Sequence, residues 1–116
     1  MDLAFEVSDE TTDGVTVVTV RGEVDVATAP TLKDHLATCS ERGDTYLVVD
    51  LEGVPFLDST GLGVLIGAAK RQRDHGGDLR LVATEPRVVK VFEITGLLEM
   101  LPIHDDVATA RREVAR

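Results

Sequence analysis

One segment constrains the possible folds more than any other: the nearly continuous apolar run Thr45-Tyr46-Leu47-Val48-Val49-Asp50-Leu51. A strand with one solvated face alternates apolar and polar residues, whereas a strand buried on both faces is apolar almost throughout. The run therefore predicts a central strand whose sheet is covered by other elements.

Further strands are predicted from β-branched and alternating residues, which suit a pleated and partly buried surface. They are a first strand around Phe5–Val7, the β-branched run Val15–Arg21, a shorter strand Leu79–Ala83 and a weak edge strand Met100–His104. Helical patterns lie between and after them, from Pro30 to Gly43, from Asp58 to Gly76, from Glu85 to Gly96 and from Asp105 to Arg116. This order predicts an α/β fold in a single domain, 1–116, with a mixed sheet of four to five strands and about four helices.

Composition and charge exclude several classes of protein. The longest uncharged apolar run, Gly63–Ala69, is far shorter than the about 20 residues of a membrane-spanning helix. Met1–Glu6 lacks the features of a signal peptide. No membrane insertion is therefore expected. The net charge of -9 disfavours direct contact with nucleic acid, which needs clustered positive charge. Together with a single cysteine, these features predict a cytoplasmic protein.

No metal or cofactor is predicted. Cys39 is alone, so an intrachain disulfide and a Cys-based zinc site are both excluded, and it is interpreted as a small core residue. His35, His75 and His104 do not share the spacing of metal ligands and are interpreted as surface residues. The carboxylates Asp50, Glu52 and Asp58 follow one strand end, where they are interpreted as solvated loop residues.

The most informative segment follows the central strand, where a short loop delivers Asp58-Ser59-Thr60 to the start of a helix. All three residue types cap helices by accepting hydrogen bonds from free backbone N–H groups, so a plain cap is one interpretation. The other interpretation is a phosphorylation site, because those N–H groups and the helix dipole stabilise an added anion.

The helix that follows contains Gly61, Gly63 and Gly67, each of which lowers helix propensity by roughly 0.8–1.0 kcal/mol relative to alanine. Gly63 and Gly67 are four residues apart and share a face. Either they allow close packing against the protein's own sheet, or they form a docking surface for a partner.

The motif Asp58-Ser59-Thr60-Gly61-Leu62-Gly63 after a hydrophobic strand resembles the signature of the STAS domain family, and more narrowly that of the anti-sigma factor antagonists. Three further segments agree with this resemblance, which covers roughly residues 5 to 103. They are Val20–Asp25 with Ala27-Thr28-Ala29, Gly76–Val82 and Val91–Leu97.

The resemblance implies a binding protein that is controlled by phosphorylation. The unmodified form is expected to bind an anti-sigma factor that is also a serine kinase, which releases sigma factor and so regulates transcription in bacteria. The kinase then phosphorylates the antagonist, which ends the binding, and a PP2C-type phosphatase resets this partner-switching cycle.

Residue by residue, the resemblance makes Ser59 the phosphoacceptor of the expected phosphoprotein. It implies a partner-binding surface made of Asp25, Asp58, Thr60, Leu62, Gly63 and Val91. Thr60 carries a second hydroxyl at the site, and the sequence leaves it open as an additional acceptor.

No enzyme activity is predicted for the chain itself. Ser59 does not lie in the G-x-S-x-G turn of a nucleophile elbow, and no phosphate-binding loop is present, so ATP would come with the partner. A second hypothesis is a STAS subunit of a membrane transport or lipid-trafficking complex; the intact motif favours the antagonist. A third, a phosphoreceiver using Asp50, requires an acidic pair and a late lysine that are not evident.

Overall fold

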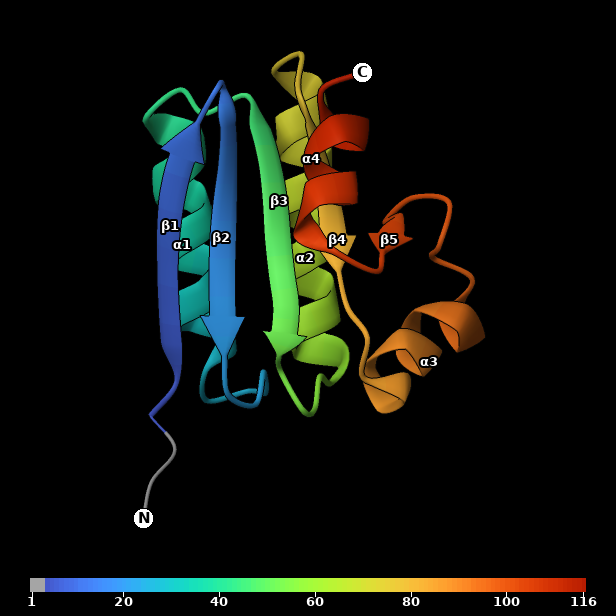
Figure 1. The fold of residues 1–116 in the computed structure, drawn as a ribbon. Coiled ribbons are helices and arrows are strands. Elements are labelled where there is room, and N and C mark those ends of the chain that lie inside the picture. Colours follow the sequence, from blue (N-terminus) through green and yellow to red (C-terminus); the bar gives the residue numbers. More distant parts are fainter. Residues whose placement is uncertain (1–3) are drawn as a thin grey trace.

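The computed structural model describes residues 4–116, which form one five-stranded sheet with helices on both faces (Figure 1). The strands are β1 (Glu6–Thr12), β2 (Val15–Arg21), β3 (Tyr46–Gly53), β4 (Asp78–Val82) and β5 (Ile103–His104), and they lie in this order across the sheet. β1 pairs antiparallel with β2, and all other neighbours are parallel. The mixed sheet predicted from the sequence is confirmed. Residues 1–3, which belong to the predicted domain and to the stretch expected to lack a signal peptide, lie outside the described residues.

The helices are α1 (Ala29–Glu41), α2 (Ser59–Asp74), α3 (Pro86–Thr95) and α4 (Val107–Val114). α1 and α2 lie side by side on one face of the sheet, and α4 lies on the other face over β3 and β4 (Figure 1). Gly96, in the left-handed region at φ 73°, ends α3, and the Asp106 carboxylate caps α4. Among the helices of residues 4–116, none combines the length and the apolar character that crossing a membrane requires.

The central strand β3 is buried on both faces, as predicted. Leu47, Val49 and Leu51 belong to the larger core, which also contains buried side chains of α1 and α2. Val48 points the other way, into a smaller core with Ala110 and Val114 of α4. The continuous apolar run therefore follows from packing on two sides, because each face of β3 meets a different set of helices.

The first and last strands differ most from their predicted ranges, while β3 ends two residues later than predicted, at Gly53. β1 continues through polar residues to Thr12, because its edge position needs few apolar side chains. The last strand is limited to Ile103 and His104, since Pro102 donates no backbone hydrogen bond and only its carbonyl accepts, from the N–H of Leu81 at 3.0 Å. These differences leave the order of the strands unchanged.

Candidate functional site

The start of α2 presents a serine at the carboxyl end of β3. Asp58 precedes the helix in an extended conformation, and its carboxylate accepts hydrogen bonds from the N–H groups of Thr60 at 2.9 Å and Gly61 at 3.2 Å. Ser59 follows as the first helical residue, and both Ser59 and Thr60 are exposed. The sequence therefore placed the helix start correctly, and of the three residue types that could cap the helix, Asp58 is the cap while Ser59 is exposed.

A second loop is fastened to this helix start by its backbone. The N–H of Val24 donates to the carbonyl of Phe56 at 3.0 Å, and the N–H of Asp58 donates to the carbonyl of Val24 at 3.1 Å. These bonds form a parallel bridge between Val24 and Leu57, both of which are buried. Asp25, which follows Val24, is thereby held close to Asp58 and the start of α2.

The Asp25 carboxylate shapes its own turn. It accepts hydrogen bonds from the N–H groups of Ala27 at 2.9 Å and Thr28 at 3.0 Å, while the Thr28 hydroxyl accepts from the N–H of Asp25 at 3.0 Å. The same hydroxyl donates to the carbonyl of Glu23 at 2.7 Å. Asp25 remains half-buried, so part of its carboxylate still faces solvent.

These hydrogen bonds correct one expectation about the site. The sequence predicts that the first N–H groups of α2 are free to receive a phosphate, but Asp58 already accepts from two of them. A phosphate on Ser59 would therefore compete with the Asp58 carboxylate or point away from the helix. Within residues 4–116, neither Asp25 nor Asp58 forms an ion pair, so no cation offsets the charge of these loops.

The three glycines of α2 have different surroundings. A Cβ at Gly61 would lie 2.4 Å from Val24 Cγ1, so this glycine is explained by close packing inside the protein. A Cβ at Gly63 or at Gly67 would meet nothing within 4 Å outside the helix backbone. Close packing inside the protein therefore accounts for Gly61 but not for Gly63 and Gly67, so the docking surface stays a prediction for these two.

Of the other predicted contact residues, two lie less openly than Ser59. Leu62 is only 7% exposed and belongs to the core, so it supports the surface from beneath. Val91 is half-buried on α3, and no hydrogen bond within residues 4–116 links α3 to the start of α2. Two residues that the sequence analysis missed, Val26 and Phe56, are 70% and 46% exposed in the bridged loops.

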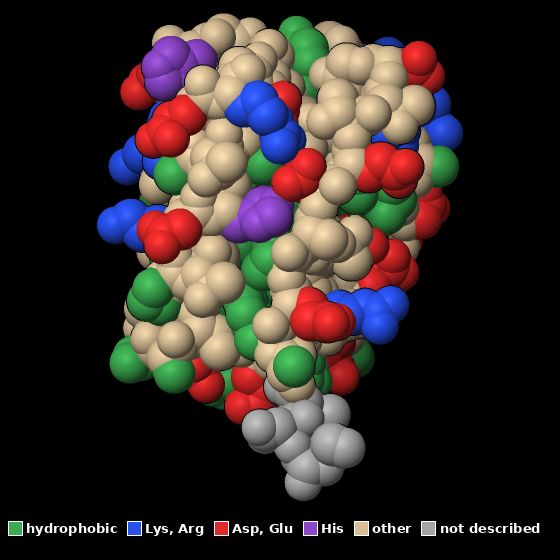
Figure 2. Space-filling model, turned by 90° about the vertical axis from the view of Figure 1, so that its left-hand side faces the viewer, with side chains coloured by type: hydrophobic (Ala, Val, Ile, Leu, Met, Phe, Trp, Pro, Cys, Tyr) green, Lys and Arg blue, Asp and Glu red, His purple; other side chains and the backbone are tan. Residues whose placement is uncertain are grey.

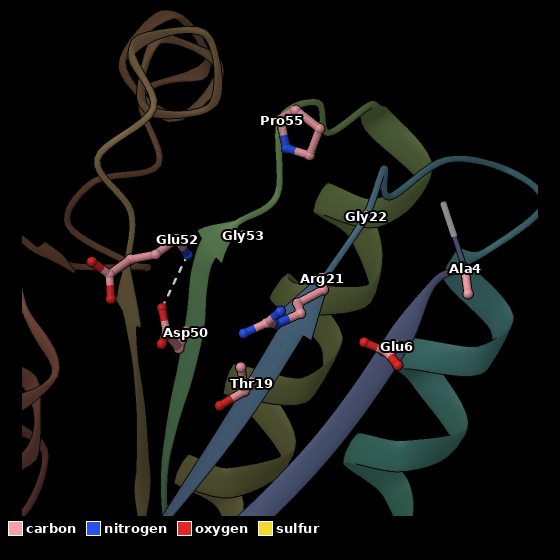
Figure 3. A pocket seen from close by; sticks show the side chains of 9 residues that line it. All are labelled: Ala4, Glu6, Thr19, Arg21, Gly22, Asp50, Glu52, Gly53 and Pro55. Carbon is pink, nitrogen blue, oxygen red and sulfur yellow. Dashed lines mark hydrogen bonds between the residues drawn. The ribbon is translucent and has the colours of Figure 1, made fainter. Parts of the chain in front are cut away.

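A hollow of about 760 Å³ lies on the face of the sheet that α1 and α2 leave open (Figure 3). Its walls carry Glu6 of β1, Arg21 of β2, and Asp50 and Glu52 of β3. Asp50 accepts a hydrogen bond from the N–H of Glu52 at 3.0 Å, and the charges of Asp50 and Asp106 raise the pKa of the Glu52 carboxyl. Asp58 is not among the residues that line this hollow, so the three carboxylates near the end of β3 do not form one group.

A cluster of polar side chains on the β1–α1 side was also missed. His35 Nε2 lies 2.6 Å from Asp9 Oδ2, Arg42 Nη2 lies 3.1 Å from Asp9 Oδ1, and the Cys39 thiol lies beneath them. Burial raises the pKa of Cys39 to about 11. Figure 2 views this side, where acidic, basic and histidine side chains are interspersed.

His35 is half-buried and contacts Asp9, a contact that the sequence did not predict, whereas Cys39 is buried as predicted. One ligand atom each of Asp9, His35 and Cys39 lies within 4.8 Å of the others, but the Arg42 guanidinium already occupies the place of a cation beside them, 3.6 Å from Cys39 Sγ. The cluster is a hydrogen-bonded network in which Arg42 forms an ion pair with Asp9.

The fold and this helix start define a class of small α/β domain. Such a domain presents an exposed serine as the first residue of a capped helix, just after a parallel strand. The model of the STAS domain family matches residues 6–110, so the chain belongs to this family. An anti-sigma-B factor antagonist of Listeria monocytogenes is 37% identical over 103 residues, covering 89% of this chain and 90% of the relative.

Two further relatives agree. The anti-sigma-B factor antagonist of Bacillus subtilis is 40% identical over 86 residues, which cover 74% of this chain and 78% of the relative. The crystal structure of an anti-sigma factor antagonist from Mycobacterium paratuberculosis is 30% identical and superposes with a TM-score of 0.84, covering 96% of this chain and 94% of that chain.

Proposed function

We propose that this protein is an anti-sigma factor antagonist whose unmodified form binds an anti-sigma factor that is also a serine kinase. Phosphorylation of Ser59 ends the binding, and a PP2C-type phosphatase restores it, all in the cytoplasm. The chain acts as a binding protein and is itself the substrate of the kinase. The names of the relatives support the antagonist role, and the exposure of Ser59 at the start of α2 is the observation on which the switch rests.

The surroundings of Ser59 favour a switch based on local charge. Phosphorylation adds about -1.5 to -2 charges at pH 7. Because Asp58 holds two N–H groups of the helix start and Asp25 lies across the bridge, the phosphate joins two carboxylates without an ion-paired cation. A dianion in such surroundings is tolerated in water but is costly to bury in an interface.

The size of the effect follows from that cost. Burying the phosphate without a new cationic partner costs several kcal/mol, and every 1.4 kcal/mol is a factor of ten in affinity. We therefore expect phosphorylation to weaken binding by roughly a hundredfold or more. Ser59→Ala should bind the kinase persistently, since it cannot be charged, and Ser59→Asp should bind poorly.

Two measurements test the proposal. The purified protein is incubated with the source organism's anti-sigma factor kinases and ATP, and the phosphate is located by mass spectrometry, with Thr60→Ala as the matched control for Ser59→Ala. Calorimetry then compares affinity across the unmodified, phosphorylated and Ser59→Ala forms. Phosphate on Thr60 alone would refute the assignment, and equal affinities of all forms would refute the switch.

The extent of structural change is measured separately. Amide NMR shifts that stay near residues 23–28 and 56–63 after phosphorylation would support the local mechanism. Shifts across the whole sheet would contradict the local mechanism while leaving the switch itself in place.

A further inference from the structure

A groove runs between α1 and α2 on the side where Gly63 and Gly67 lack neighbours. It has a volume of about 360 Å³ and begins at Thr60, directly after Ser59. The half-buried Val64 contributes apolar surface to it above the buried Leu36 and Ala68, and Lys33 and Arg71 contribute the charges. The groove is therefore continuous with the start of α2, but its charge is opposite to that of the acidic loops at Asp25 and Asp58.

The open glycines of the groove have no explanation inside the protein. Glycine in a helix interior is unfavourable, and a Cβ at Gly63 or Gly67 would meet nothing within 4 Å outside the helix backbone. Gly61, in the same helix, is fully explained by its contact with Val24. The missing side chains at Gly63 and Gly67 leave room for another chain to approach the backbone of α2.

Arg71 adds an independent observation. Its Nε is buried and has no hydrogen-bond partner, and neither Arg71 nor Lys33 forms an ion pair within residues 4–116. A buried N–H without a partner is unfavourable and is satisfied best by a charged acceptor. In a chain of net charge -9, two free cations along one groove mark a place for carboxylates from outside.

We propose that the groove between α1 and α2 docks a segment of the anti-sigma factor that carries a carboxylate next to small apolar side chains. The carboxylate accepts hydrogen bonds from Arg71 and Lys33, and the apolar side chains cover Val64 and the backbone at Gly63 and Gly67. This inference rests on the proposed function and assigns the partner a second contact beyond Ser59. Acidic loops and a basic groove on one continuous surface also fix the orientation of the partner.

The test fills the groove without disturbing the fold. Gly67→Leu places a side chain in open space and improves helix propensity, so its thermal midpoint should equal or exceed that of the wild type. Its affinity for the kinase, measured by calorimetry, should be at least about tenfold lower than that of the wild type. The affinity of Gly67→Ala should lie between those of the wild type and Gly67→Leu. Lys70→Leu is the matched control, because Lys70 is exposed on the same helix and does not line the groove.

Charge is tested in the same way. Arg71→Glu should weaken binding by about tenfold at low salt and less at high salt, whereas Lys70→Glu makes the same change of charge outside the groove and should have little effect. If Gly67→Leu and Arg71→Glu both bind the kinase with the affinity of the wild type, the groove inference is overturned and the proposed function is left intact. No binding of the wild type to any anti-sigma factor kinase of its source organism would instead overturn the proposed function, and the groove inference with it.

Discussion

Charged side chains are paired with one another on the β1–α1 side of the molecule, whereas at the start of α2 they are not. On the first side, Asp9 is contacted by both His35 and Arg42. At the start of α2, the partners of Asp25 and Asp58 among residues 4–116 are backbone N–H groups and the Thr28 hydroxyl. The comparison teaches that interactions closed within the chain stabilise the fold, while groups left open at its surface are available for recognition. Substitutions on the two sides should therefore change different measurements.

The largest expected effect is on stability, at a glycine whose contact is closed within the chain, as on the β1–α1 side. A Cβ at Gly77 would lie 1.8 Å from the carbonyl oxygen of Thr45, a backbone atom that cannot move aside cheaply. We expect Gly77→Ala to lower the free energy of unfolding by about 3 kcal/mol or more. Urea denaturation measures it, with Gly67→Ala as the control that should not destabilise. An unchanged midpoint for Gly77→Ala would contradict this close contact.

The next effect is on binding and not on stability. Gly63→Asp places a carboxylate on the open face of α2, where it would meet an acidic partner segment in the groove. We expect binding to the kinase to fall at least about tenfold, while the circular dichroism spectrum and thermal midpoint stay close to those of the wild type. An unfolded Gly63→Asp protein would show that the position is packed internally. Normal binding would count against docking at this face.

A smaller effect is expected from the helix cap at the start of α2, where a residue of the open side also stabilises the fold. Asp58→Ala removes the acceptor of two N–H groups and should cost about 1 kcal/mol of stability. Asp74→Ala at the other end of α2 is the control. It should be neutral or slightly stabilising, because a negative charge is unfavourable near a helix carboxyl end. Chemical denaturation measures the free energy of unfolding of both variants. Equal losses of stability in the two would show that Asp58 does not act as a cap.

The smallest effect is a dependence of stability on pH. Burial alone would raise the pKa of the Asp9 carboxyl, but hydrogen bonds from His35 and Arg42 outweigh burial and hold the pKa below its ordinary value. A carboxyl whose pKa is lowered by folding stabilises the protein above its unfolded pKa of about 3.9, and this contribution is lost as the pH falls through the folded pKa.

Asp9→Asn should therefore destabilise the protein at pH 7 by on the order of 0.5–1 kcal/mol, and the difference from the wild type should shrink towards pH 3. Glu10→Gln, at the exposed neighbour on β1, is the control and should show no such change. Urea midpoints at several pH values measure both. If the difference in stability between Asp9→Asn and the wild type grew towards acid pH, folding would not lower the pKa of Asp9.

The sequence predicts the start of α2 well because capping is local chemistry. Asp58 and the N–H groups that it accepts from lie within three residues of one another, so their arrangement needs no tertiary contact. The strand β3 is predictable for a similar reason, since burial on two faces leaves a continuous apolar run in the sequence itself.

The features that the sequence does not predict depend on contacts between distant residues. His35 and Asp9 are 26 positions apart, and only the packing of α1 against β1 brings them together. The glycines of α2 have the same residue type in one helix, yet only the place of Val24 separates packed Gly61 from open Gly63 and Gly67. No local pattern contains that information, because Val24 reaches α2 through a different loop.

The backbone bridge between Val24 and Leu57 has a consequence for the kinetics of partner exchange. A loop that becomes ordered only on binding loses conformational entropy at that moment, which reduces affinity and can slow association. Here the two loops that flank Ser59 are already fixed to each other by hydrogen bonds of 3.0 and 3.1 Å. The free protein thus holds the proposed recognition surface in a prepared conformation, so changes at Ser59 should appear mainly in the lifetime of the complex and little in its rate of formation.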